Sequence, residues 1–185
     1  VEVLHFDANM ALSDTAGCMP LTVQFTDQSN STDSIISWIW KFDNGISVNA
    51  PNPLELFSSP GTYNIKLKIE TQRGCIDSIS TPLTVFGLPH ADAGPDTSIC
   101  VGESIALNGS GGGSYDWSPS IGLSSYNIAK PVAQPHVSRE YELIVTDSNG
   151  CRHRDLVMID VNPYPVSTIS TGASLCLGDS AQLEV

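Results

Sequence analysis

The chain has 185 residues and a formal net charge of −12, because 20 acidic side chains face only 8 Lys and Arg. Nucleic acids and anionic membrane surfaces are bound through basic patches, so this charge argues against both as the main partner. No apolar stretch approaches the roughly 18 residues of a membrane-spanning helix. A hydrophobic content of 41% with 15 Gly and 12 Pro is typical of a folded, turn-rich protein, and five Cys favour an oxidising, extracellular location.

Apolar and polar residues alternate along most of the chain. Residues 63–69 show the pattern most clearly, with Tyr, Ile, Leu and Ile separated by Asn and Lys. The same alternation occurs at residues 21–25, 105–107, 141–145 and 157–161. A period of two indicates half-buried strands, and the Gly, Pro and Asn clusters between them indicate turns. The sequence therefore predicts an all-β fold of antiparallel sandwiches.

An internal repeat divides the chain. Residues 98–107 (SICVGESIAL) return as residues 174–183 (SLCLGDSAQL), with five of ten positions identical. Residues 63–75 and 141–151 also match, since each is a strand followed by a turn and Gly-Cys. We predict a first domain at 1–87, a second at 88–163 and the opening strands of a third, truncated repeat at 164–185. The natural polypeptide is then expected to continue, and the proline-containing junctions are expected to be stiff.

The cysteines follow the repeat. Four Cys can pair in three ways, and sequence alone does not choose among them. The repeat favours two disulfides, each within one unit: Cys18–Cys75 and Cys100–Cys151. Cys176 then matches Cys100 and is unpaired here, with its partner outside the sequence. The alternatives are reduced thiols or a metal site, although the sequence has no Cys-x-x-Cys pair of the kind that binds zinc.

Three motifs follow one another in the first unit: residues 18–27 (CMPLTVQFTD), 37–45 (SWIWKFDNG) and 59–63 (SPGTY). In this order they resemble a PKD (polycystic kidney disease) domain, and the resemblance covers about residues 4–86. The family pattern in the middle motif is Trp-Asp-Phe-Gly-Asp-Gly. Here Lys41 replaces the Asp and Asp43-Asn44 replaces Gly-Asp. The Asn-Gly turn should survive these changes.

The second unit has four ordered segments: residues 93–96 (AGPD), 99–104 (ICVGES), 115–119 (YDWSP) and 145–151 (VTDSNGC). Together they resemble the Ig/PKD-like repeats of very large surface proteins of type IX-secreting, often gliding, bacteria. The resemblance implies secretion, tandem repetition in an extended rod, and an adhesive or filament-forming parent protein. It supplies no catalytic residues.

The aromatic residues have two interpretations. Trp38, Trp40 and Phe42 fall on one face of a predicted strand, where exposed rings would form a carbohydrate-stacking platform. The alternative is a role in the core, since a sandwich needs large buried rings. We assign four aromatic residues to the core: Trp40, Trp117, Tyr63 and Tyr141.

Acidic residues provide weak calcium candidates. Ca²⁺ needs six to eight clustered oxygen ligands, and no Asp-x-Asp-x-Asp-Gly loop occurs. The candidates are Asp27, Asp33 and Asp43 in the first unit and Asp92 and Asp96 near the first junction. Solvated surface charge is the preferred interpretation, so no cofactor is assigned.

Four Asp-Ser/Thr triplets resemble the O-glycosylation acceptor of the same bacterial group. Their hydroxyl residues are Thr15, Ser34, Ser78 and Ser180. A glycan on these residues would lie on exposed loops or strand edges.

The sequence contains no catalytic motif. The four His lie in separate segments, without a His-Glu-x-x-His or Gly-x-Ser-x-Gly pattern. We therefore expect a non-catalytic spacer, adhesin or filament module of a large secreted cell-surface protein, whose partners are other repeats, surface glycans or neighbouring chains. The alternative is an accessory carbohydrate- or protein-binding module of a secreted multidomain hydrolase.

Overall fold

The computed structural model describes residues 5–164, and within this range all regular structure is β-strand. The first ten strands are β1 (Phe6–Asp7), β2 (Met10–Leu12), β3 (Ala16–Cys18), β4 (Leu21–Asp27), β5 (Asn30–Ser31), β6 (Ile35–Lys41), β7 (Ser47–Val48), β8 (Leu54–Phe57), β9 (Gly61–Thr71) and β10 (Ile76–Phe86). The remaining six are β11 (Thr97–Cys100), β12 (Ile105–Ala106), β13 (Ser114–Ser118), β14 (Val132–Ala133), β15 (Arg139–Thr146) and β16 (Arg152–Asn162). The predicted all-β fold class is confirmed.

The first ten strands form one sandwich. A five-stranded sheet in the order β3-β10-β9-β6-β7 lies against the three-stranded sheet β2-β4-β8, and β1 pairs with β5. Strand β9 illustrates why the two sheets pack face to face. Its residues Ile65, Leu67 and Ile69 are buried on one face, whereas Asn64 and Lys66 on the other face are exposed. The two inner faces enclose a core of aliphatic and aromatic side chains, including Val23, Phe25, Trp40, Phe42 and Phe57.

The last six strands form a second, smaller sandwich. Its sheets have the orders β11-β16-β15-β13 and β12-β14. Strand β15 buries Tyr141, Leu143 and Val145 on alternate positions, as the period of two predicts. These side chains pack with Trp117 and Ile159 in a core that is separate from the first one.

Both sandwiches share one topological feature that positions their cysteines. The short strand carrying the first cysteine runs parallel to the last strand of the same sandwich. In the first sandwich β3 pairs with β10, and Cys18 lies opposite Phe86. In the second sandwich β11 pairs with β16, and Cys100 lies opposite Asn162. The first cysteine of each sandwich is therefore beside the point where the chain leaves that sandwich.

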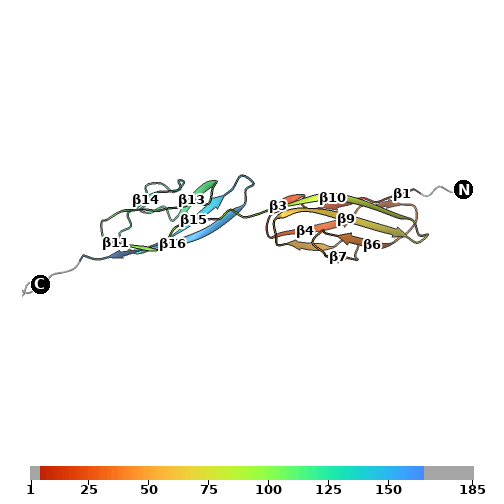
Figure 1. The fold of residues 1–185 in the computed structure, drawn as a ribbon, viewed down its shortest axis with the longest axis horizontal. Coiled ribbons are helices and arrows are strands. Elements are labelled where there is room, and N and C mark those ends of the chain that lie inside the picture. The colour runs from red at the N-terminus through yellow and green to blue at the C-terminus, as the bar shows by residue number, and fades with distance from the viewer. Residues whose placement is uncertain (1–4, 165–185) are drawn as a thin grey trace, which may run out of the picture.

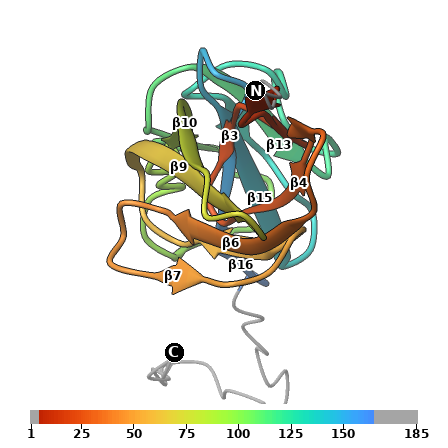
Figure 2. The ribbon, with the colours of Figure 1, turned by 90° about the vertical axis from the view of Figure 1, so that its right-hand side faces the viewer.

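The two sandwiches follow one another along the long axis of the molecule (Figure 1). A view along this axis from the N-terminal side places the strands of the first sandwich in front of those of the second (Figure 2). The backbone passes between them through the half-buried residues Gly87, Leu88 and Pro89. The predicted third repeat at 164–185 falls almost entirely outside the described residues. Among residues 5–164, no helix has the length and apolar character needed to cross a membrane.

Candidate functional site at the junction between the sandwiches

The disulfide of the structure joins the two sandwiches. Cys18 is bonded to Cys151, with 5.5 Å between their Cα atoms and 133 positions between them in the sequence. The predicted pairings Cys18–Cys75 and Cys100–Cys151 do not form, and within residues 5–164 Cys75 and Cys100 carry free thiols. Cys176 lies outside the described residues.

Strand direction explains the correction. Cys18 lies opposite Phe86 at the end of β10, whereas Cys75 directly precedes Ile76 at its beginning. Ten residues of strand at 3.3 Å each place the two cysteines about 33 Å apart. A disulfide requires Cα atoms within about 7 Å, so Cys18 and Cys75 cannot be bridged. The same holds for Cys100 and Cys151, which lie at opposite ends of β16.

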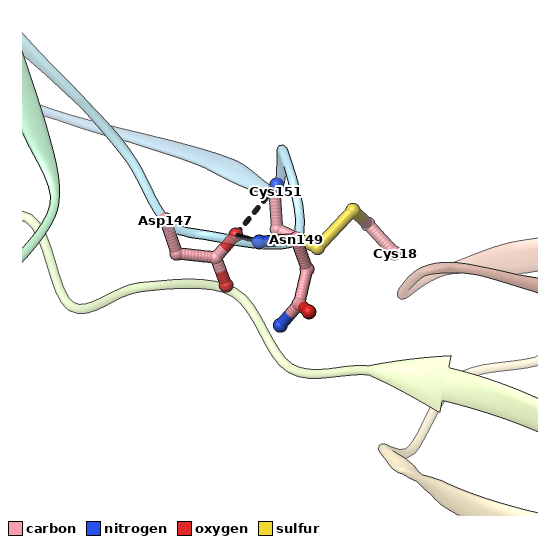
Figure 3. The surroundings of a disulfide bond; sticks show 4 residues. All are labelled: Cys18, Asp147, Asn149 and Cys151. Atoms are coloured by element: carbon pink, nitrogen blue, oxygen red, sulfur yellow. Dashed lines mark hydrogen bonds between the residues drawn. A yellow bond between two sulfur atoms is a disulfide. The ribbon is translucent and has the colours of Figure 1, made fainter.

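Cys151 is held by the turn between β15 and β16. Asp147 Oδ1 accepts hydrogen bonds from the amides of Asn149 (2.9 Å) and Cys151 (2.8 Å), as Figure 3 shows. The Asp147 amide in turn donates to the Cys151 carbonyl at 2.9 Å. Gly150 adopts a φ of 82°, a conformation that favours glycine. The turn therefore presents the Cys151 sulfur in a defined direction, towards the first sandwich.

Cys18 is fixed by the exit of the first sandwich. The Met19 amide donates to the Phe86 carbonyl at 2.9 Å, one residue before the junction begins at Gly87. On the other side of the junction, the Ala93 amide donates to Asp155 Oδ2 at 2.8 Å near the start of β16. The disulfide and the backbone junction therefore lie at the same end of each sandwich.

Two covalent connections consequently join the sandwiches. The backbone through residues 87–89 is one attachment point, and Pro89 limits its rotation. The Cys18–Cys151 bond adds a second attachment point and restricts the movement of one sandwich relative to the other. Cys151 itself is fully buried, whereas Cys18 is half-buried, so the bond is sheltered on the side of the second sandwich.

The predicted core aromatics occupy the interior to different extents. Trp40, Trp117 and Tyr141 are fully buried, and Tyr63 is half-buried against the first core. The Trp40 and Trp117 indole N–H groups donate to the carbonyls of Ala50 and Ile128. The Tyr141 hydroxyl donates to the Ile121 carbonyl, and burial raises the pKa of this phenol.

Trp38, the candidate for a carbohydrate platform, packs at the edge of the first core. It is half-buried, and its Nε1 donates to Asp27 Oδ2 at 2.6 Å. A ring bonded and packed in this way offers less face to a sugar than a freely exposed ring would.

The acidic candidates are dispersed. Each accepts a hydrogen bond from a different nitrogen: Asp27 from Trp38 Nε1, Asp33 from Arg73 N, Asp43 from Asn64 N, Asp92 from Gly94 N and Asp96 from Met158 N. Among residues 5–164, no three His, Cys, Asp or Glu side chains are grouped so that they could hold a metal ion. The backbone hydrogen bond from Arg73 lowers the pKa of Asp33. These carboxylates act locally, as acceptors that shape loops and strand ends.

The glycosylation candidates Thr15, Ser34 and Ser78 are exposed, and Ser180 lies outside the described residues. One hollow of about 280 Å³ opens at the end of the second sandwich, lined by mostly apolar residues together with His136 and Ser138. The Ser138 hydroxyl accepts a hydrogen bond from the Val161 amide, so it serves the strand there.

Sequence reasoning missed Asp147, which organises the Cys151 turn. The Asp-x-x-Gly-Cys spacing at 147–151 is a signal that was available, because Asp side chains commonly bond the amide two residues later in a turn. The bond between Cys18 and Cys151 itself had no comparable signal in the sequence.

Comparison with protein families identifies the first unit. Residues 7–85 match the family model of the PKD domain. The prediction of a PKD domain in this part of the chain is therefore confirmed.

Two curated relatives extend over both units. The chain is 30% identical over 181 residues to the dyslexia-associated protein KIAA0319 homolog of Rattus norvegicus, and 29% identical to that of Mus musculus. These alignments include 80% of this chain but only 17% of each relative, so the chain spans a small part of their length.

Solved structures also resemble the chain. The PKD1 domain of the Vibrio cholerae metalloprotease PrtV is 23% identical, with 42% of this chain and 93% of that chain covered and a TM-score of 0.39. The eight N-terminal Ig domains of the Down syndrome cell adhesion molecule are 13% identical. The match covers 86% of this chain and 25% of the chain of that structure, with a TM-score of 0.47.

Proposed function

We propose that this chain, whose residues 7–85 match the PKD domain, is a non-catalytic structural and adhesive module of an extracellular surface protein. The observation that carries the proposal is the double connection between the sandwiches. A protein that only displays a binding site needs one linker, whereas a load-bearing spacer benefits from a junction that resists bending. The pair of sandwiches then acts as a short segment of a stiff rod.

The disulfide also defines the path of a pulling force. A load applied between the two ends of the chain enters through residues 1–18, crosses the Cys18–Cys151 bond and leaves through residues 151–185. Residues 19–150 lie inside the covalent loop, so their unfolding does not lengthen the chain between its two ends while the bond is intact. The length of chain released under load is therefore limited by covalent structure and does not depend on how stable the two cores are.

Single-molecule stretching of the full chain tests this proposal. With the bond intact, about 130 residues cannot extend between the two ends of the chain, and they correspond to roughly 450 Å of extended chain. Reduction of the bond, or Cys18→Ser, should add this length to the total extension. Cys75→Ser is the matched control and should leave the oxidised extension unchanged. Equal extensions for the oxidised chain and Cys18→Ser would refute a load-limiting role.

The kind of parent protein, its export route and its partners are inferred from the sequence motifs of the second unit. These motifs favour a large bacterial protein exported by the type IX route, with gliding or filament formation as its setting, and with other repeats and surface glycans as partners. Extracellular location is tested on intact source cells: the protein should be removed by added protease. Protection until the cells are broken would contradict it.

The alternative, an accessory carbohydrate-binding module of a hydrolase, has less support from the geometry. Its leading candidate, Trp38, is half-buried and bonded to Asp27. A polysaccharide that shifts the fluorescence of the chain, with the shift lost on Trp38→Phe, would reverse this preference.

A further inference from the structure

The turn that carries Cys75 repeats the turn that carries Cys151. In the first sandwich Thr71 N donates to the Cys75 carbonyl at 2.9 Å, and Gly74 N donates to the Thr71 carbonyl at 2.9 Å. In the second sandwich Asp147 makes the same two backbone bonds with Cys151 and Gly150, at 2.9 and 3.1 Å.

The remaining features of the two turns agree as well. Gly74 and Gly150 have φ values of 80° and 82°. The Cys75 amide donates to Thr71 Oγ1, and the Cys151 amide donates to Asp147 Oδ1. Cys75 is therefore presented at the far end of the first sandwich in the way that Cys151 is presented at the junction.

The position of Cys100 likewise repeats that of Cys18. Each is the last residue of a short strand parallel to the final strand of its sandwich. The residue after each cysteine donates to the carbonyl opposite that cysteine, Met19 to Phe86 and Val101 to Asn162, both at 2.9 Å. One difference is that the Cys100 amide donates to Glu103 Oε2, which adds a local turn after the strand. Cys100 is half-buried, as Cys18 is, and so is Cys75.

Each sandwich thus carries two different cysteine positions at opposite ends. One is the turn position, at Cys75 and Cys151, and the other is the strand-end position, at Cys18 and Cys100. The bond in the structure joins a strand-end cysteine to the turn cysteine of the next sandwich. At the outer ends of the two-sandwich unit, the complementary halves of this arrangement, Cys75 and Cys100, are unbonded within residues 5–164.

We propose that Cys75 and Cys100 are head-to-tail disulfide sites for further sandwich domains of the same kind. Cys75 accepts the strand-end cysteine of one neighbour, and Cys100 accepts the turn cysteine of another. The neighbour is a domain of the same polypeptide or of a second copy of this chain. The proposal rests on the structural role proposed above and deepens it, because a heterologous contact that does not close on itself generates an open filament.

The bond forms by thiol–disulfide exchange with a small disulfide such as oxidised glutathione. The thiolate of Cys100 attacks one glutathione sulfur, and a mixed disulfide forms as one glutathione thiolate leaves and is protonated. The thiolate of the incoming turn cysteine then attacks the Cys100 sulfur and releases the second glutathione. Two protein thiols lose two electrons and two protons, and the small disulfide gains both.

The test uses the full chain with Cys176→Ser, so that only two free thiols remain. One variant adds Cys75→Ser and presents Cys100 alone, and the other adds Cys100→Ser and presents Cys75 alone. Each is incubated separately, and then both together, in a glutathione redox buffer. Dimers are followed on non-reducing gels and assigned by peptide mapping.

The expected result is a Cys75–Cys100 dimer that forms at least ten-fold faster than either symmetric dimer. This outcome identifies a second copy as a competent neighbour. If the Cys75–Cys75, Cys100–Cys100 and Cys75–Cys100 dimers form in the proportions expected from random pairing, the proposal that two copies recognise each other is wrong. The second arm of the test is disulfide mapping of the oxidised polypeptide isolated from its source. A bond from Cys75 to a strand-end cysteine, or from Cys100 to a turn cysteine, of another sandwich in the same chain supports the proposal. Free thiols at both positions in the source protein overturn it altogether.

This test is independent of the stretching experiment. Stretching depends only on the Cys18–Cys151 bond, whereas dimer formation depends only on Cys75 and Cys100. The failure of one proposal is therefore distinguishable from the failure of the other.

Discussion

Thr71 and Asp147 occupy the same position in the two hairpin turns, and each accepts a hydrogen bond from the amide of the cysteine four residues later. The distance is 3.2 Å from the Cys75 amide to the Thr71 hydroxyl and 2.8 Å from the Cys151 amide to the Asp147 carboxylate. Asp147 also accepts the Asn149 amide. Hydrogen bonds to a charged acceptor are shorter and stronger than neutral ones, so the turn at the junction is the more firmly held.

Replacement of Asp147 by alanine should therefore loosen the Cys151 turn. Two charge-assisted bonds are lost, and we expect the second sandwich to be destabilised by about 1.5–3 kcal/mol. Hydrogen exchange measured by mass spectrometry reports each sandwich separately, and the increase should be confined to peptides of the second sandwich, with β15 and β16 included. Asp160→Ala removes an exposed carboxylate of β16 and is the matched control, with an effect within about 0.5 kcal/mol. Equal effects of the two substitutions would deny Asp147 its role in the turn.

The Cys18–Cys151 bond should stabilise both sandwiches, although it lies within neither core. When the second sandwich unfolds beside a folded first one, the bond still holds Cys151 near the junction and closes a loop of about 60 residues. In the chain-entropy model such a loop contributes about 4 kcal/mol. The argument is symmetrical for the first sandwich, whose unfolded chain is tied between Cys18 and the junction.

Cys18→Ser should consequently lower the free energy of unfolding of both sandwiches by up to about 4 kcal/mol each. Urea titration with exchange detection of β9 and β15 measures the two separately. Cys75→Ser changes a free thiol and should leave both midpoints unchanged. A loss restricted to one sandwich would mean that this sandwich does not serve as a folded anchor when the other one unfolds.

The strands and cores follow directly from local sequence. Alternation at 63–69 predicts a half-buried strand, and β9 buries Ile65, Leu67 and Ile69 on one face. A two-residue period needs no information about neighbouring strands, because it depends only on which face is buried. Trp40 and Trp117 needed a further argument, that a sandwich requires large buried rings, and both are buried in the structure.

The disulfide depends on non-local information that the sequence does not contain. The repeat correctly equates Cys18 with Cys100 in position and Cys75 with Cys151 in turn geometry, but equivalence within a repeat does not state which ends meet. That depends on the parallel pairing of β3 with β10, which places Cys18 at the exit of the sandwich and Cys75 at its far end. A parallel strand pair has no tight turn to mark it in the sequence. The spacing of the cysteines in the sequence therefore could not predict a disulfide between the two units.

Trp38 offers a test of whether its ring serves structure or binding. Its Nε1 lies 2.6 Å from Asp27 Oδ2, and its ring packs against the first core. Trp38→Phe keeps most of the ring but leaves the carboxylate without this donor, so we expect a loss of about 1–3 kcal/mol in the stability of the first sandwich. Asp27→Asn retains an acceptor at the same site and should cost less. An unchanged stability in Trp38→Phe would contradict a structural role for the indole.

Asp33 makes the Cys75 turn sensitive to acid. Its Oδ2 accepts the Arg73 amide at 2.9 Å, and this bond is the main cause of a pKa lowered from the ordinary value of 3.8. Because the folded-state pKa lies below the unfolded one, the ionised carboxylate stabilises the turn above pH 3.8, and this contribution is lost as the pH falls through the lower folded value.

The titration is observable at the donor itself. The NMR shift of the Arg73 amide should change with a midpoint below 3.8, because the bond weakens when Asp33 is protonated. In Asp33→Asn this step should disappear, since the side chain no longer titrates, while the rest of the first sandwich keeps its spectrum. A midpoint at or above 3.8 in the unmodified chain would mean that the Arg73 bond does not favour the charged form. The turn would then present Cys75 equally well to a neighbouring sandwich in acid and at neutral pH.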